Sequence, residues 1–356
     1  MEKAEGRRQK AEGRRQKAEG RRQKAEGRRR IVGLDFVKGV TIFLVVFGHC
    51  IEWGNGQELF SSGAFRDDTL YKIIYSFHMP LFALVSGYLF FWSAESRTPR
   101  ELIMRQTNSL ILPAFSWTLL MKSLRATFHA LIGDLAGAVS VVQSMPSSFL
   151  YGFWFLWAMF LASLAVILAR EKFRDNLKFY IFSLVICLFV PGNIIPSKHI
   201  FVYPYFIAGY LWHRENVQPV NSKLIRAGIV LLWCSMLIFY DRSSYVYTTG
   251  TQIANWSGFR KGQLWIDLFR WMIGFAGCGA VLILLNLIKP VTIFSKLGVR
   301  SIGIYIMSGY VMKYLPEQGG YIINFLEAVV ISGVCYVLSE GISRVKVLNM
   351  LLFGSR

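Results

Sequence analysis

The stretch Arg30-Ile-Val-Gly-Leu-Asp-Phe-Val-Lys-Gly-Val-Thr-Ile-Phe-Leu-Val-Val-Phe-Gly-His49 carries an acid and a base near its start and a histidine at its end. Its apolar part is long enough to cross a membrane as a helix. Ionisable side chains are costly to place inside a membrane-spanning helix. Asp35, Lys38 and His49 are therefore candidates for function rather than for packing.

Helical geometry places these three residues on one face of the predicted span. At about 100° per residue, His49 falls about 40° from Asp35 and about 20° from Lys38 after full turns. At about 1.5 Å per residue, His49 lies roughly 21 Å above Asp35. Asp35 is thus too far away to orient His49. The pattern predicts a polar passage with Asp35 and Lys38 at the cytoplasmic end and His49 at the opposite end.

The composition indicates a polytopic membrane protein. The chain has 356 residues, of which 54% are hydrophobic, and a mean hydropathy of +0.40. Soluble domains are about 45–50% apolar. We therefore predict an all-α, integral membrane helical bundle of about ten transmembrane helices. The predicted spans are residues 34–52, 72–92, 108–131, 150–169, 178–195, 200–213, 224–240, 265–286, 301–315 and 321–339.

The charge distribution predicts the orientation. The net charge of +19 is concentrated in the N-terminal tail and in alternate loops, as the positive-inside rule expects. Arg97, Arg100 and Arg105, for example, fall in one predicted cytoplasmic loop. We expect both termini to be cytoplasmic, in a multi-pass protein of the bacterial inner membrane. This location also explains the positive charge without a nucleic-acid partner.

Three segments are predicted along the chain. Residues 1–30 repeat a basic heptad that begins Glu5-Gly-Arg-Arg-Gln-Lys-Ala11. Alanine is its only apolar residue, so we predict a disordered tandem-repeat tail attracted to anionic membrane lipids rather than a coiled coil. A membrane domain follows at 31–345, and a short cytoplasmic C-terminal tail at 346–356.

A second histidine lies at a similar predicted depth on the next span. His78 is followed by a proline, and Ser86-Gly87-Tyr88 forms a small-residue step that permits close helix approach. A lone membrane histidine can simply form an interhelical hydrogen bond. A histidine pair beside a charged stripe can instead accept and return a proton, as acyl transfer to a hydroxyl requires.

The order and spacing of several motifs resemble the acyltransferase type 3 family of integral membrane acyltransferases, especially its fucose O-acetylase-like branch. The motifs are Asp35-x-x-Lys38-Gly39 with His49, Tyr75-Ser-Phe-His78-Met-Pro with Ser86-Gly87-Tyr88, Arg105 to Pro113, Trp154-Phe-Leu-Trp157, Tyr203-Pro-Tyr-Phe-Ile-Ala-Gly209 and Leu297-Gly-x-x-Ser301-Ile-Gly-Ile-Tyr305. The resemblance extends from Arg30 to about Arg344.

The resemblance implies transfer of an acyl group from cytoplasmic acyl-CoA, most often acetyl-CoA, to a hydroxyl of a cell-surface or exported carbohydrate such as lipopolysaccharide, or to a lipid-linked saccharide. It implies a catalytic role for His49, which His78 would assist, and an acyl-CoA contact for Arg105. A guanidinium suits the phosphates of CoA. Positive-inside bias explains Arg105 equally well.

Two features depart from the family pattern. Many relatives end the ninth span with a histidine, whereas this chain reads Tyr305-Ile-Met-Ser308-Gly-Tyr310. We also expect no extracytoplasmic hydrolase-like domain of the kind that some relatives carry. A role that rests on either feature is therefore not transferred to this protein.

Asp267 and Arg270 are expected to form an i,i+3 ion pair, and Glu327 is left without a role. Five dispersed cysteines indicate no disulfide framework, and no metal is expected.

A transporter or flippase of an envelope glycan remains the alternative function, with the polar stripe as its path. A non-catalytic envelope assembly protein is the third possibility, but it gives the buried histidines no purpose.

Overall fold

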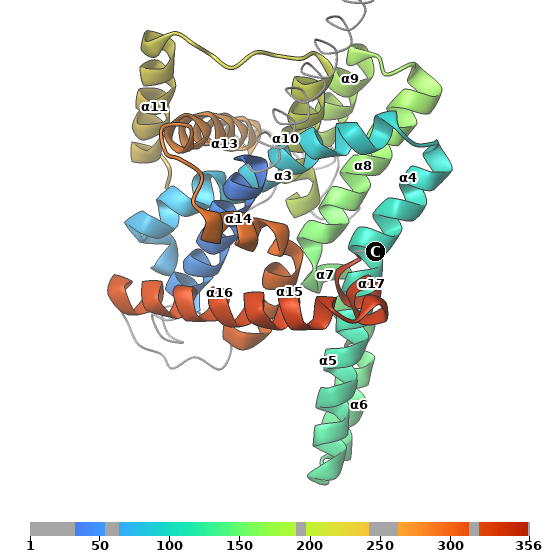
Figure 1. Ribbon diagram of the computed structural model, residues 1–356. Coiled ribbons are helices and arrows are strands. Elements are labelled where there is room, and N and C mark those ends of the chain that lie inside the picture. Colours follow the sequence, from blue (N-terminus) through green and yellow to red (C-terminus); the bar gives the residue numbers. More distant parts are fainter. Residues whose placement is uncertain (1–32, 54–63, 190–196, 242–262, 313–319, 355–356) are drawn as a thin grey trace, which may run out of the picture.

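The computed structural model describes residues 33–53, 64–189, 197–241, 263–312 and 320–354 as helices and connecting turns, with no strand among them (Figure 1). The predicted tail at 1–30 lies outside these residues. The helices are Gly33–Trp53, called here the first helix, α3 (Thr69–Glu95), α4 (Pro99–Gln106), α5 (Leu112–Leu131), α6 (Leu135–Gln143), α7 (Met145–Gly152), α8 (Trp154–Phe173), α9 (Leu177–Cys187), α10 (Ser197–Arg214), α11 (Lys223–Ile238), α13 (Gln263–Leu285), α14 (Thr292–Val299), α15 (Ser301–Val311), α16 (Tyr321–Ser343) and α17 (Lys346–Phe353).

Five of the described helices are long and apolar enough to cross a membrane. They are Gly33–Trp53, Thr69–Glu95, Trp154–Phe173, Leu264–Leu285 and Tyr321–Ser343. The all-helical class predicted from the sequence is confirmed for the described residues. The larger set of about ten spans and the orientation of the termini remain predictions.

A tight crossing of α3 and α10 forms the centre of the bundle. A Cβ added at Gly87 of α3 would overlap the carbonyl oxygen of Phe206, and one at Gly209 of α10 would overlap that of Leu84. The two backbones therefore approach each other through reciprocal glycines. The close helix approach predicted from the small-residue step at Gly87 is confirmed, and its partner is Gly209.

The first helix is held in the same way against α14. A Cβ at Gly39 would overlap the Phe294 carbonyl oxygen, and one at Gly298 would overlap that of Asp35. Further along, Phe43 contacts Phe325 of α16 with ring centroids 5.6 Å apart. These contacts fix the axial position of the first helix and hence of His49 at its other end.

A buried ion pair lies in α13. Arg270 Nη1 is 3.2 Å from Asp267 Oδ1, and both side chains are almost completely buried. The i,i+3 pair predicted from the sequence is confirmed. The Tyr205 hydroxyl of α10 donates to the Arg270 carbonyl oxygen at 3.2 Å, so the pair lies at a packed interface and not in the cavities described below.

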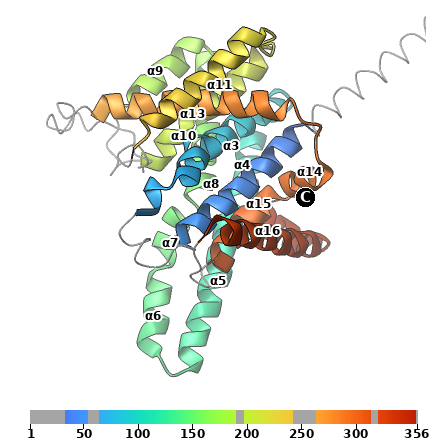
Figure 2. The same ribbon diagram turned by 90° about the vertical axis from the view of Figure 1, so that its left-hand side faces the viewer.

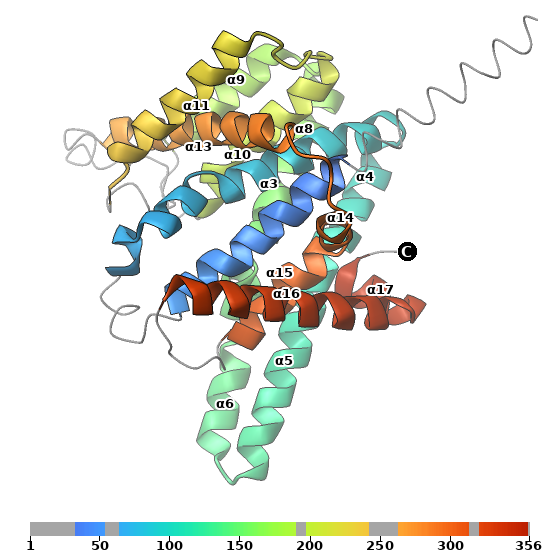
Figure 3. The same cartoon turned by 60° about the vertical axis from the view of Figure 1, so that its left-hand side comes forward.

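A helical hairpin projects from the bundle. α5 and α6 run side by side and extend away from the other helices in all three orientations (Figures 1, 2 and 3). A π-helical segment, Thr107–Ile111, joins α4 to α5. Pro113 follows it and has no N–H for the regular i−4 bond, which explains the local widening of the helix.

α17 packs against the start of α5. Trp117 Nε1 of α5 donates to the Leu352 carbonyl oxygen at 2.9 Å. Gly354 ends α17 with a φ of 64° and lies directly against Asn108 and Ser109 of the π-helical segment. Residues 346–353, predicted as part of a C-terminal tail, thus form a helix that contacts the base of the hairpin.

Candidate active site

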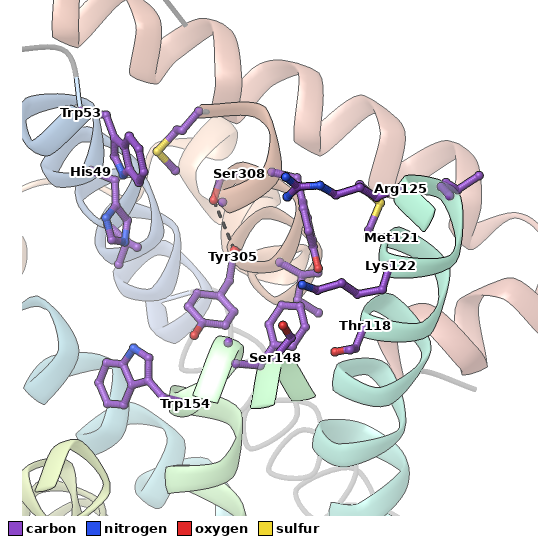
Figure 4. Close-up of a pocket in the computed structure, with 18 of the residues that line it drawn as sticks. His49, Trp53, Thr118, Met121, Lys122, Arg125, Ser148, Trp154, Tyr305 and Ser308 are labelled. Carbon is purple, nitrogen blue, oxygen red and sulfur yellow. Dashed lines mark hydrogen bonds between the residues drawn. The ribbon is translucent and has the colours of Figure 1, made fainter. Parts of the chain in front are cut away.

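A large cavity beside His49 lies between the hairpin and the bundle. It has a volume of about 860 Å³ and is bounded by the first helix, α5, α7, α8 and α15. Figure 4 shows His49 and Trp53 on one wall and the α5 side chains on the opposite one. Its polar and aromatic lining includes His49, Trp53, Thr118, Lys122, Arg125, His129, Ser148, Trp154, Tyr305, Ser308 and Tyr310.

His49 is oriented by a carboxylate one turn further along its own helix. Its Nδ1 is 2.9 Å from Glu52 Oε2. The Tyr75 hydroxyl of α3 donates to the same carboxylate oxygen at 3.1 Å and lies 3.4 Å from His49 Nδ1. A proton on Nδ1 leaves Nε2 as the acceptor nitrogen, and His49 lines the cavity. This is the arrangement of a histidine general base with an orienting acid.

The sequence analysis did not single out Glu52, and it named Tyr75 only as part of a motif, without a role. The signal for Glu52 was available, because His49 and Glu52 are spaced i,i+3 and therefore share a helix face. Tyr75 is brought to this face by packing of α3 against the first helix. Its ring centroid is 6.3 Å from that of His49, in an edge-on arrangement.

His78 lies behind Tyr75 and outside the lining of the cavity. Its side chain is 2% exposed, and its Nδ1 donates to the Ile74 carbonyl oxygen at 2.8 Å. The His78 and Tyr75 ring centroids are 4.4 Å apart. The structure therefore brings the two histidines into contact with one tyrosine ring, with only His49 facing the cavity.

Asp35 and Lys38 lie at the opposite end of the first helix. Lys38 Nζ is 3.5 Å from Asp35 Oδ1, and both side chains are partly buried. Neither lines the cavity that contains His49. A second cavity of about 400 Å³ lies at their end of the helix and is lined by Gly33, Leu34, Phe36 and Val37 among others. On the face between the two ends, Ile42 and Val45 are buried apolar side chains.

Arg105 is exposed on α4. It is absent from the described lining of both cavities, so the structure does not bring it to His49. The predicted contact of Arg105 with acyl-CoA remains a prediction.

The α5 wall carries basic side chains that sequence analysis did not single out. Lys122, Arg125 and His129 are spaced i, i+3 and i+7 and line the same cavity. Lys122 Nζ donates to Ser144 Oγ at 2.8 Å, and His129 Nδ1 is 2.7 Å from Asp134 Oδ2. All three fall within the predicted span 108–131, where ionisable residues are a signal of function.

α15 supplies the wall beside His49. Tyr305 and Ser308, which stand in the ninth-span stretch that lacks the family histidine, both line the cavity (Figure 4). Ser308 Oγ donates to the Tyr305 carbonyl oxygen at 3.3 Å. This stretch thus contributes hydroxyl-bearing side chains to the cavity that His49 lines, whereas many relatives have a histidine at the end of this span.

Metal binding receives no support from the described residues. They contain no group of three or more histidine, cysteine, aspartate or glutamate side chains placed to hold a metal ion.

Comparisons with known proteins identify the family. The chain is 29% identical to nodulation protein NolL of Sinorhizobium fredii over 230 residues, which are 61% of this chain and 60% of that protein. It is 26% identical to nodulation protein NolL of Mesorhizobium japonicum over 193 residues, or 54% of this chain and 49% of that protein. The chain thus spans about half to three-fifths of these relatives' lengths. No solved structure matches significantly.

A family model described as an acyltransferase domain matches residues 31–343. This range contains the first helix, α5, α7, α8 and α15, and therefore every described wall of the cavity around His49. The resemblance predicted from the motifs is confirmed. The chain belongs to the acyltransferase type 3 family.

Proposed function

We propose that this protein is an integral membrane O-acyltransferase. It moves an acyl group, most simply acetyl, from cytoplasmic acyl-CoA to a hydroxyl of a cell-surface or exported carbohydrate. The observation that carries this proposal is the hydrogen-bonded set of His49, Glu52 and Tyr75 at the wall of a large cavity. Membership of an acyltransferase family supports the same chemistry.

The geometry supports a general-base mechanism. The acceptor hydroxyl approaches His49 Nε2 and gives up its proton as its oxygen attacks the thioester carbonyl carbon. Glu52 stabilises the imidazolium that forms, because its carboxylate already accepts a hydrogen bond from Nδ1. The tetrahedral intermediate collapses, the carbon–sulfur bond breaks, and the CoA sulfur takes the proton from His49. In a two-step variant, His49 Nε2 attacks the thioester carbonyl and the carbon–sulfur bond breaks to release the CoA thiolate. The acceptor hydroxyl then attacks the acyl-imidazolium, its proton passes to the thiolate, and His49 is released.

His78 is proposed to assist as a positioning residue. It contacts the Tyr75 ring, and Tyr75 in turn hydrogen-bonds Glu52. The Asp35–Lys38 pair and Arg105 are proposed to lie along the path by which acyl-CoA enters from the cytoplasm. The proposed topology has about ten spans in the bacterial inner membrane, with both termini in the cytoplasm.

A transporter or flippase is the second candidate function. One observation favours it: cavities lie at both ends of the first helix, one at Gly33–Val37 and one at Val45–Trp53. A transported glycan would pass between them without a change in its covalent structure.

Acetyl-CoA labelled separately in the acetyl group and in the adenine distinguishes the two functions. Membranes that contain the protein are incubated with each compound, and surface or lipid-linked glycan is then isolated. An acyltransferase places the acetyl label, and not the adenine label, on glycan. Membranes from a deletion strain provide the blank. Glycan that remains unlabelled in both preparations contradicts the proposal.

Glu52→Gln is expected to reduce the rate of acyl transfer. The amide no longer accepts a charge-assisted hydrogen bond from His49 Nδ1, so we expect a loss of about 10- to 100-fold in kcat. Initial rates of labelled acetyl transfer measure the effect. Glu95→Gln is the matched control, because Glu95 is exposed at the far end of α3. Equal rates for both variants would remove Glu52 from the mechanism.

A further inference from the structure

The α5 wall of the cavity carries three basic side chains. Lys122 and Arg125 lie one turn apart, and His129 lies one further turn toward the hairpin tip. No aspartate or glutamate occurs among the described residues that line this cavity. Lys122, Arg125 and His129 thus give this wall of the cavity a basic character.

Neighbouring groups hold this basic face in place. The Lys122 ammonium is anchored on Ser144, at the junction of α6 and α7. His129 is oriented by Asp134 at the hairpin tip. The Gly137 backbone N–H and His129 lower the pKa of the Asp134 carboxyl from its ordinary value, so Asp134 stays ionised near neutral pH. Exposed Arg125 lies between these two anchored side chains.

The chemistry of these groups suits a phosphate. A guanidinium binds two phosphate oxygens at once, and an ammonium supplies a compact positive charge. An acyl-transfer reaction does not itself need such a pair, since the proposed base is His49 on the opposite wall. The basic pair is better explained as a recognition site for part of a substrate.

Apolar side chains flank the basic pair. Leu124 and Phe128 line the cavity beside Arg125 and are 58% and 60% exposed. Beyond the cavity, Leu131, Ile132 and Leu135 continue this exposed apolar surface to the hairpin tip. A phosphate attached to a long apolar group would contact both the basic and the apolar side chains.

We propose that Lys122 and Arg125 bind a phosphate group of one of the acyl-transfer substrates, within the cavity that contains His49. This inference rests on the proposed function for the identity of the substrates. Two sources supply the chemistry: the phosphates of CoA, and the phosphate of a lipid carrier to which the acceptor saccharide is attached. The exposed apolar flank matches the lipid carrier more closely.

Direct binding to the purified full-length protein in phosphatidylcholine nanodiscs tests the proposal. Coenzyme A is one probe and a polyprenyl phosphate is the other. The double variant Lys122→Met/Arg125→Met is expected to weaken binding of one probe by about 10-fold or more, since each charged hydrogen bond contributes substantially. Binding of the other probe remains at the wild-type level. The probe that is affected identifies the source of the phosphate.

Three controls separate charge from structure. Lys172→Met removes an exposed lysine of α8 and should leave binding unchanged. Ser144→Ala removes the Lys122 anchor but keeps the charge, so it should retain most of the affinity. Lys122→Arg/Arg125→Lys keeps both positive charges and should bind the affected probe as the wild type does. Retained binding in this variant attributes the loss in the double methionine variant to the missing charges.

The outcomes also separate this inference from the proposed function. Wild-type affinity for both probes in the double methionine variant overturns the inference, as does failure of the wild-type protein to bind either probe. Acyl transfer that continues in those cases leaves the proposed function intact. Loss of probe binding in the variant, with no acyl transfer by the wild type, supports the phosphate site and contradicts the proposed function alone.

Discussion

His49→Gln is expected to reduce acyl transfer by about 100- to 10,000-fold, because removal of a general base eliminates proton abstraction from the acceptor hydroxyl. Glutamine is similar in size and polar, so the cavity wall should remain filled. The loss should appear in kcat, since the side chain acts on the reacting hydroxyl rather than on binding. Initial rates with labelled acetyl-CoA in purified membranes provide the measurement.

Protein quality is the essential control for this experiment. Yield, elution as a single species and thermal unfolding midpoint should match the wild type, because His49 has a partly exposed side chain and not a core position. A transfer rate within a small factor of wild type, in protein that passes these checks, would remove His49 from catalysis. Comparison with Glu52→Gln then orders the effects: loss of the base should exceed loss of its orienting carboxylate.

Gly87→Ala is expected to prevent normal assembly of the bundle. The added methyl group would overlap the Phe206 carbonyl oxygen, which belongs to backbone and cannot rotate away. Overpacking in a core typically costs about 1–3 kcal/mol, and a backbone collision lies at the upper end of this range or beyond it. The yield of monodisperse protein and the thermal midpoint measure the loss.

Gly333→Ala is the matched control for the crossing. Gly333 is a helical glycine of α16 with open space where an added Cβ would lie. Alanine there should leave stability unchanged or raise it slightly, because it restricts the unfolded chain without a clash. A Gly87→Ala protein as stable as Gly333→Ala would show that α3 and α10 adapt their crossing, contrary to the structure.

Local sequence signals predicted the features that depend on one helix at a time. Periodicity and composition indicated the helical class, and i,i+3 spacing identified the Asp267–Arg270 pair. A small-residue step marked Gly87 as a point of close approach. Each of these signals lies within a single stretch of chain, where helical geometry converts spacing directly into position.

Features built by packing between helices could not be predicted in the same way. Tyr75 reaches Glu52 because α3 packs against the first helix, and Gly209 lies against the backbone of Leu84 although the two are far apart in the sequence. The basic side chains of α5 were missed for a different reason. Lys122 and Arg125 were visible within a predicted span, but their common cavity with His49 depends on the projection of the hairpin beside the bundle.

The contact between α17 and the start of α5 has a consequence for the dimensions of the cavity. α17 contributes no described residue to the lining, yet Leu352 and Gly354 fix the direction in which α5 leaves the bundle. That direction sets the gap between the basic wall on α5 and the imidazole on the first helix. The width of the cavity is thus set at the base of the hairpin, by a helix that lies outside the described lining.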